Sequence, residues 1–418
     1  MNFDLMRSLL IDRALRGELS AYSNSVAAEE KSLNEQKTKP FQIPYDWQWK
    51  CVADCVQFNP KVIQDDTAEV SFIPMADVEP GFVDQCSTRQ TKLWAKVKKG
   101  FSRFQEGDLL VAKITPCFQN RKSCVAKNLT NGTGAGSTEF HVMRCVSGVD
   151  AKFLLFFFKS EYFIRYGVNH FNGTVGQQRV GTQDIKDCLV PVPPFEEQTR
   201  IVEKLEAAFV EIDRAEKAYE ELQTLAGVLR GQILQKAIQG QLVTQLDTEP
   251  SVEMIGDAPV DVPFAIPEKW KWVKLKSVFS MQAGKFISAS SIQPEGKYPC
   301  YGGNGLRGYV DVSNRKGRFP LIGRQGALCG NVHVVDGDFY ATEHAVVVDC
   351  REYGDPDCVG LFLEAMNLNQ YATATAQPGL SVKKIVELPF PLPPKDEQVR
   401  IVSKVKDLMK QVDALSAK

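Results

Sequence analysis

The chain has 418 residues, which is enough for at least two domains. Hydrophobic residues make up 44% and charged residues 24% of the chain, so composition excludes a disordered or fibrous protein. The 50 basic residues are balanced by 51 acidic ones, and the net charge of −1 excludes attraction to nucleic acid by overall charge alone.

No apolar run is long enough for a membrane span, and the N-terminus lacks the pattern of a signal peptide. The 11 cysteines form no CxxC pair and no zinc-type spacing, and their number is odd. The four histidines are scattered, which favours structural roles over metal binding. We therefore expect a cytoplasmic protein with reduced thiols, no metal site and no membrane contact.

The chain repeats itself at two different offsets. The first offset is about 223 residues and the second about 200, because the segment between the matched motifs is shorter in the second copy. Repeats are sought first, since they decide the fold class. The first offset carries Arg7–Leu19 onto Arg230–Leu242 and Pro40–Pro44 onto Pro263–Pro267, and the second carries Ile185–Val202 onto Ile385–Val402.

The repeat is out of phase with the termini. The two ends of the chain, 395–418 and 1–20, together correspond to the central segment 195–243. Only Tyr219–Gln223 have no counterpart. A chain whose ends complete one element is a cyclic arrangement cut open, which predicts a pseudo-two-fold molecule with neighbouring termini.

The central segment 195–243 predicts one long helix. Its apolar residues alternate three and four positions apart, as in a coiled-coil seam, and Gly240 stands where a C-terminal cap is expected. We predict that this helix pairs antiparallel with the copies at 395–418 and 1–20; the alternative is that each helix packs on its neighbouring domain. The predicted packing residues are Phe3, Met6, Leu10, Ile201, Leu205, Ile212, Leu222, Leu229, Ile233, Ile401, Val405, Leu408, Val412 and Leu415.

Two mixed α/β segments, 41–194 and 264–394, lie between polar, acidic stretches at 21–40 and 244–263 that are typical of linkers. The fold class is therefore α+β, and the globular segments share little sequence apart from their edges. Two similar frames with divergent inserts suit a protein that reads two different sites. The expected strands are Val70–Ile73, Leu109–Ala112, Phe140–Met143, Val332–Val335 and Ala345–Val348, and the expected helices Ala151–Tyr166 and Gly360–Tyr371.

Tests for enzyme motifs are negative. Gly303–Gly308 matches GxGxxG, but strand-like Tyr309–Val312 follows it instead of a helix, which indicates a turn between strands. No GxxxxGK[ST] phosphate loop is present. An amino-methyltransferase needs Asn or Asp before its Pro-Pro-aromatic motif, whereas Val192 stands there and cannot accept a hydrogen bond.

Charge is uneven despite the neutral total. The stretch from Lys92 to Lys127 holds nine basic residues against the acids Glu106 and Asp108. Such a run is commonly a solvated face, but the asymmetry favours a surface that meets phosphates. The basic residues are Lys92, Lys96, Lys98, Lys99, Arg103, Lys113, Arg121, Lys122 and Lys127.

Several motifs resemble those of type I restriction-modification specificity subunits. They are Pro-Pro-x-x-Glu-Gln-x-Arg-Ile-Val at the start of a long helix, Gln-Lys-Ala-x-x-Gly-x-Leu at its end, and Ile-Pro-x-x-Trp-x-Trp at the start of each globular segment. Gly107–Pro116 and Leu321–Gly330 are similar to further segments of that family. The resemblance covers nearly the whole chain. Many members end with a full second helix, whereas this chain ends at Lys418.

The resemblance implies two target-recognition domains, 41–194 and 264–394, separated by two long antiparallel coiled-coil helices. Each domain would read one half of a bipartite site in double-stranded DNA, and the helices would set the spacer and dock two methyltransferase subunits. S-adenosylmethionine would belong to those subunits, and ATP and magnesium to motor-endonuclease subunits, with no cofactor and no catalysis on this chain. The alternative is a coiled-coil scaffold that does not bind DNA, which explains the repeat but not the basic stretch.

Candidate DNA-binding residues are polar side chains beside turn-like or glycine-rich sequence, suited to base edges. For any one of them, a surface position without a base contact is the alternative. In the first domain they are Lys113, Thr115, Gln119, Asn120, Arg121, Lys122, Gln177, Gln178 and Arg179. In the second they are Lys285, Asn304, Arg307, Arg324, Gln325 and His344.

Overall fold

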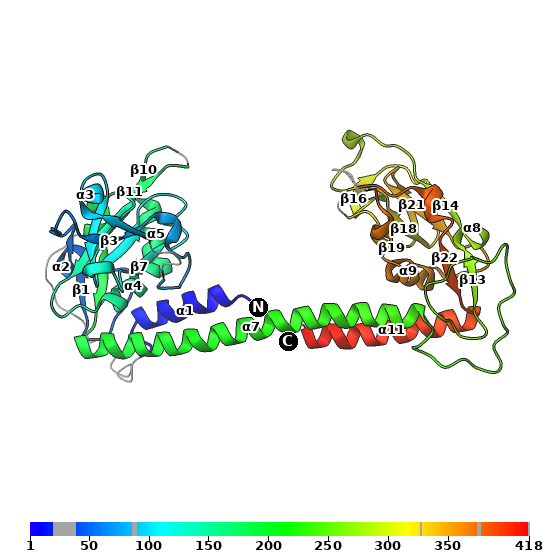
Figure 1. Ribbon diagram of the computed structural model, residues 1–418, viewed down its shortest axis with the longest axis horizontal. Helices are drawn as coiled ribbons and strands as arrows, with labels where there is room; N and C mark the ends of the chain where they lie inside the picture. Colours follow the sequence, from blue (N-terminus) through cyan, green and yellow to red (C-terminus); the bar gives the residue numbers. More distant parts are fainter. Residues whose placement is uncertain (20–38, 86–89, 175, 327, 374–377, 417–418) are drawn as a thin grey trace. The chain divides into compact units, whose positions relative to one another are not determined.

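The computed structural model describes residues 1–418 except 20–38, 86–89, 175, 327, 374–377 and 417–418 (Figure 1). The chain forms two compact units, Met1–Lys217 and Ala218–Lys418. The boundary falls within the long helix α7 (Phe195–Ile238), so each unit contains a globular domain and part of this helix. The mixed helix-and-sheet class and the two-domain organisation agree with the prediction from the sequence.

The described part of the first unit contains two four-stranded sheets. One is antiparallel throughout, whereas the other contains a parallel pair, β3 with β8. The first sheet has the order β2 (Val56–Phe58), β9 (Phe140–Cys145), β6 (Leu109–Ala112), β7 (Ser123–Val125). The second has the order β4 (Gln90–Leu93), β3 (Glu69–Ile73), β8 (Thr133–Gly136), β5 (Ser102–Gln105).

The described part of the second unit repeats this topology strand for strand. Taken in chain order, β14 to β21 occupy the places of β2 to β9, and β15 pairs in parallel with β20 as β3 does with β8. The sheets have the orders β14 (Ser280–Ala283), β21 (Ala345–Asp349), β18 (Phe319–Gly323), β19 (Val332–Val335) and β16 (Gly305–Val310), β15 (Tyr298–Gly302), β20 (Asp338–Ala341), β17 (Arg315–Lys316). Two segments with little common sequence therefore build the same frame. All five expected strands are confirmed.

Each domain is closed by a two-stranded antiparallel sheet that joins its first and last strands. Short helices follow the first strand and precede the last one in both units. The pairs are β1 (Gln48–Cys51) with β12 (Leu189–Val192), and β13 (Lys271–Lys274) with β22 (Pro389–Leu392). The short helices are α2 (Val52–Cys55), α6 (Thr182–Asp187), α8 (Leu275–Val278) and α10 (Val382–Ile385). The first unit also contains α3 (Trp94–Val97) and the strands β10 (Phe171–Asn172) and β11 (Arg179–Val180).

The predicted helix Ala151–Tyr166 is two helices, α4 (Ala151–Lys159) and α5 (Glu161–Asn169). Ser160 breaks it, because its backbone is extended (φ −69°, ψ 153°) and its hydroxyl caps α5 by accepting from the Phe163 N–H at 3.1 Å. All residues from Phe153 to Phe158 are buried, so α4 is enclosed on every side. Periodicity alone did not reveal the break.

In the second unit the expected helix Gly360–Tyr371 begins and ends earlier in the chain than predicted. Helix α9 runs from Pro356 to Ala365, and Asp355 caps its start by accepting from the Cys358 N–H at 3.0 Å. Asn367 then takes a left-handed conformation (φ 47°), which ends the helix before a 3₁₀ turn.

Helix α1 (Phe3–Leu15) packs antiparallel along the first part of α7. Near its start, the Arg7 guanidinium lies 2.6 Å from the Asp213 carboxylate and 2.5 Å from that of Glu216. Beyond its end, Lys204 donates to the Leu19 carbonyl at 2.6 Å. The first unit thus contains a helix pair held by charges as well as apolar contacts.

Helix α11 (Lys395–Ser416) packs antiparallel along the second part of α7. Arg230 pairs with Asp413 at 2.6 Å. Gln223 donates to the Ser416 carbonyl at 2.9 Å. Gln223 is one of the five residues without a counterpart in the repeat, so part of this segment covers the end of α11.

The predicted packing residues do not all lie inside the helix pairs. Met6, Leu229 and Leu415 are 40%, 42% and 56% exposed. The buried face of α1 runs through Phe3, Arg7 and Ile11, so Met6 points away from it. Buried predicted residues are Phe3, Ile201, Leu205, Ile401, Val405 and Val412, and half-buried ones are Leu10, Ile212, Leu222, Ile233 and Leu408.

Several of these seam residues also pack on the globular domains. Ile201 and Leu205 belong to the core cluster of the first domain, and Ile401 and Val405 to that of the second. The sequence predicted either packing between helices or packing of each helix on its neighbouring domain. Where the helices lie beside the domains, both kinds of packing therefore occur together.

Equivalent glutamines fasten the helices to the domains. Gln198 accepts from the Asp150 N–H at 2.7 Å and donates to the Gly148 carbonyl at 3.1 Å. Gln398 accepts from the Asp355 N–H at 2.6 Å in the same way. Both glutamines are fully buried, which explains the Gln in the repeated motif.

In each unit a glycine lies at the point where a helix connects to the globular domain. Gly17 and Gly240 both have positive φ (76° and 69°), which favours glycine. A Cβ on either would lie 2.3 or 2.4 Å from the ring of Pro44 or Pro267. In each unit the repeated glycine therefore packs closely against the proline of the repeated Ile-Pro motif.

The stretch 244–263 has no helix or strand, but an ion pair holds part of it against α11. Glu249 is 4% exposed, and Arg400 donates to its carboxylate at 2.6, 2.8 and 3.0 Å. The stretch 21–40, also predicted as a linker, lies outside the described residues except for 39–40. Among the described helices, none has the length and apolarity needed to cross a membrane.

Candidate nucleic-acid interface

Three segments of the first domain meet at one edge, which we call the Lys113 edge: the loop 113–116 after β6, Glu139 before β9, and 177–179 at β11. The Lys113 N–H donates to the Glu139 carbonyl at 3.0 Å. The Thr115 N–H donates to the Gln178 carbonyl at 2.9 Å, and the Thr115 hydroxyl accepts from the Gln178 N–H at 3.1 Å. Five candidates, Lys113, Thr115, Gln177, Gln178 and Arg179, therefore share this edge.

Glu139 is a member of this edge that the sequence did not reveal. Its carboxylate accepts from Nε and Nη2 of Arg179 at 3.0 and 2.9 Å. The hydrogen bonds from Arg179 hold the pKa of the Glu139 carboxyl below its usual value. No sequence signal announces a pair of residues 40 positions apart.

The second domain builds the same edge with other side chains; we call it the Arg324 edge. The Arg324 N–H donates to the His344 carbonyl at 2.9 Å, as Lys113 does to Glu139. The Gly326 N–H donates to the Pro378 carbonyl at 2.9 Å, as Thr115 does to Gln178. The isolated β-bridge between Gln325 and Gly379 corresponds to that between Ile114 and Arg179.

These hydrogen bonds define equivalent positions. Arg324 stands in the place of Lys113, His344 in that of Glu139, and Gly379 in that of Arg179. The backbone pattern is common to both edges, whereas the side chains differ in charge and shape.

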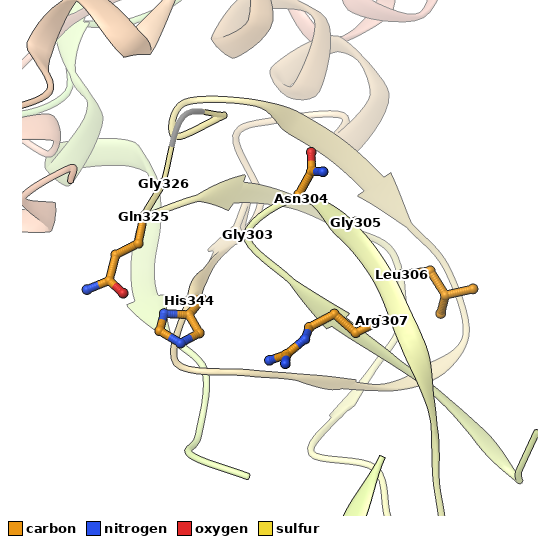
Figure 2. Close-up of a pocket in the computed structure, with 8 residues that line it drawn as sticks. All are labelled: Gly303, Asn304, Gly305, Leu306, Arg307, Gln325, Gly326 and His344. Atoms are coloured by element: carbon orange, nitrogen blue, oxygen red, sulfur yellow. The ribbon is translucent and has the colours of Figure 1, made fainter. Parts of the chain in front are cut away.

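A hollow of about 440 Å³ opens beside the Arg324 edge (Figure 2). The Arg307 guanidinium extends toward the His344 ring, while Leu306 points away from it. Four candidates line this hollow: Asn304, Arg307, Gln325 and His344. Lys285 lies on a neighbouring segment, where its N–H donates to the Ala341 carbonyl at 3.0 Å.

The GxGxxG match is confirmed as a turn between strands. It spans the connection from β15 to β16, which pair as an antiparallel hairpin. Gly305 has φ +95°, a conformation that favours glycine. The motif thus shapes one wall of the hollow rather than the start of a helix.

Gln119, Asn120 and Arg121 follow the loop of the Lys113 edge, and the Asn120 N–H donates to the Pro116 carbonyl at 2.9 Å. They line a groove of about 1310 Å³ together with side chains of α1 and α7. The Arg121 guanidinium bonds to the Glu161 carboxylate at 2.6 Å and to the Lys159 carbonyl at 2.9 Å. Lys122 donates to the Met75 carbonyl at 3.1 Å. Arg121 and Lys122 thus make contacts within the domain, and the DNA-binding role of these four residues stays a prediction.

Several side chains of the basic stretch 92–127 have partners within the domain. Lys98 and Lys127 each pair with an aspartate, at 2.6 and 2.5 Å. The Lys92 ammonium lies 3.3 Å from the centre of the Phe72 ring. Lys96, Lys99 and Lys113 have no ion pair among the described residues, which leaves them for a partner with negative charge.

A sequence model of the family described as "Type I restriction modification DNA specificity domain" matches residues 44–224 and 267–418. The chain belongs to this family. The matched ranges contain nearly all of both domains, the part of α7 up to residue 224 and the whole of α11, in agreement with the resemblance seen in the motifs.

Named relatives agree with this assignment. The specificity subunits of the type I restriction enzymes EcoAI and EcoEI of Escherichia coli are 26% and 25% identical to the chain. These alignments cover 98% and 99% of this chain, and 89% and 90% of those subunits. The EcoprrI specificity subunit of Escherichia coli is 49% identical over 31% of this chain and 33% of its own length.

Two solved structures show the same fold. One comes from a study of assembly and conformational transition in the type I restriction-modification system, with a TM-score of 0.70 and 20% identity over 90% of this chain and 94% of that one. The other is the HsdS subunit from Thermoanaerobacter tengcongensis, with a TM-score of 0.59 and 19% identity over 90% and 92% of the two chains.

Proposed function

We propose that the chain is the DNA-specificity subunit of a type I restriction-modification complex and has no catalytic activity of its own. The observation that carries the proposal is the frame built twice, with Lys113, Glu139 and Arg179 in one copy and Arg324, His344 and Gly379 at the same backbone positions in the other. A common frame with different side chains suits two readers of different sequence. The two half-sites therefore differ, and the bipartite target is asymmetric.

The chemistry of the two edges suits the major groove of double-stranded DNA. Arginine and lysine donate to guanine, and glutamine bonds to adenine through its amide. Lys96 and Lys99 are exposed and contribute phosphate contacts, which position a protein without selecting a sequence. The Lys113 edge reads one half-site, and the Arg324 edge with its hollow reads the other.

The helices serve the rest of the complex in this proposal. α7 forms an antiparallel coiled coil with α1 and with α11. The arrangement is pseudo-two-fold and cyclic, and α1 completes the helix that α11 begins. The antiparallel contacts of Arg7 and Arg230 within the two units support this pairing. The helices set the spacer between half-sites and dock two methyltransferase subunits, which bring S-adenosylmethionine, while motor-endonuclease subunits bring ATP and magnesium.

The adenine methylome of cells that express the chain with its methyltransferase subunit tests the proposal. We expect one asymmetric bipartite motif with a fixed spacer, absent from cells in which only this chain is deleted. If no such motif appears while the same methyltransferase is active with another specificity subunit, the proposal is wrong. The scaffold alternative predicts that second result.

A further inference from the structure

The Arg179 guanidinium is held in one orientation by its neighbours. Nε and Nη2 donate to the Glu139 carboxylate at 3.0 and 2.9 Å, and Nη1 donates to the Gln177 carbonyl at 3.0 Å. A guanidinium has five N–H donors, so three are used among the described residues and two are left. The side chain is nevertheless 44% exposed, which leaves those two donors within reach of a ligand.

The frame does not need this ion pair. At the same backbone positions of the second domain stand Gly379 and His344, and equivalent backbone hydrogen bonds surround them. Exposed ion pairs also contribute little to stability. A pair present in only one of two equivalent frames belongs to what differs between the domains, which under the proposed function is the sequence that each one reads.

The charge of the pair favours a base over a phosphate. Glu139 neutralises Arg179, so the pair has little net attraction for the DNA backbone, where binding depends on uncompensated positive charge. The two remaining donors keep their ability to form hydrogen bonds. Guanine presents two acceptors, O6 and N7, at its major-groove edge.

We propose that Arg179 reads a guanine in the first half-site and that Glu139 is its positioning residue. This inference rests on the proposed function. It predicts one G·C pair at a fixed place in the half-site read by the Lys113 edge. Lysine at position 179 would keep the positive charge but lose the two-pronged arrangement of N–H donors that a guanidinium presents. The substitution Arg179→Lys therefore separates base reading from phosphate binding.

The test uses the whole chain assembled with its methyltransferase subunits, and target DNAs in which each base pair of the first half-site is changed in turn. Arg179→Lys should weaken binding to the intact site by roughly 5- to 150-fold and remove the preference for one G·C pair. Preferences in the second half-site should stay. Equal weakening on all DNAs would assign a phosphate contact and overturn the inference, as would unchanged preference.

Glu139→Gln tests the positioning role separately. It should relax the preference at the same G·C pair, because glutamine offers one acceptor oxygen where two now hold the guanidinium. A change at another base pair, or none, would overturn the role of Glu139. A loss of folding alone would not relax the preference at one base pair only.

Arg165→Lys is the matched control. Arg165 pairs with Glu161 at 2.9 Å in the same domain and is 77% exposed, so its replacement should leave all preferences unchanged. Failure of this inference is distinguishable from failure of the proposed function. If the unaltered complex shows no preference for a bipartite site, the proposed function is wrong. If the unaltered complex shows that preference and the Arg179→Lys complex has the same base preferences, only the reading of guanine is wrong.

Discussion

Arg144 and Asp108 fasten the strands that carry the Lys113 edge. Asp108 is fully buried immediately before β6, and it accepts from Nε and Nη2 of Arg144 on β9 at 2.7 and 2.9 Å. It also accepts from the Gln105 N–H at 2.7 Å. We predict that removing the arginine destabilises the first unit more than neutralising the aspartate.

The magnitudes follow from burial. Arg144→Met leaves a buried carboxylate with one remaining side-chain hydrogen bond, which costs about 3–5 kcal/mol. Asp108→Asn leaves an arginine whose side chain is 34% exposed and can reach water, so the cost is about 1–3 kcal/mol. Both changes also loosen the strands that position Lys113 and Glu139, so they should weaken binding to the first half-site.

Urea unfolding followed by far-UV circular dichroism measures the difference, with Arg165→Met as the control for an exposed pair. The control should shift stability by about 0–1 kcal/mol. The order expected is Arg144→Met, then Asp108→Asn, then the control. If Asp108→Asn is the more damaging of the pair, or if Arg144→Met matches the control, the reasoning from burial is refuted.

Three further predictions address the second edge, the helix break and pH. Arg324→Ala should weaken binding to one half-site only; equal loss at both half-sites, or none, would contradict its place on the Arg324 edge. Ser160→Ala should lower the stability of the first unit by about 1 kcal/mol in urea unfolding, since α5 loses its cap, and an unchanged midpoint would contradict this. Burial lowers the pKa of His141 to about 4, below its value in the unfolded chain. The unfolded state therefore binds the proton first, and stability should fall by about 3 kcal/mol as the pH drops from 6.5 to 4. His141→Gln should flatten that part of a stability-against-pH curve, and a variant with the same slope would show that another group titrates.

Local pattern was enough for the elements that repeat. The heptad spacing predicted the long helix, and the offsets placed its partners at both ends of the chain. The buried glutamines Gln198 and Gln398 show why those motifs could be recognised: each must make the same hydrogen bonds in its own unit. Short strand-like runs of residues predicted the expected strands for the same local reason.

Local pattern failed where a single backbone torsion or a distant neighbour decides. Ser160 interrupts an apolar run that has no glycine or proline, so the break between α4 and α5 is invisible to periodicity. The ion pair between Arg121 and Glu161, which are 40 positions apart, was likewise not predicted. Nothing in the sequence around Arg121 or Glu161 indicates that the two residues are in contact.

The sequence by itself determined the family, the two-fold repeat and the helices that join its copies, because these depend on periodicity and on motifs that recur at fixed offsets. Only the tertiary structure decided which residues of the two domains are equivalent. Lys113 and Arg324 correspond through backbone hydrogen bonds to Glu139 and His344, and such bonds are the same whatever the side chains are. Two divergent inserts can therefore share one frame that no alignment of their side chains reveals, while the side chains remain free to differ.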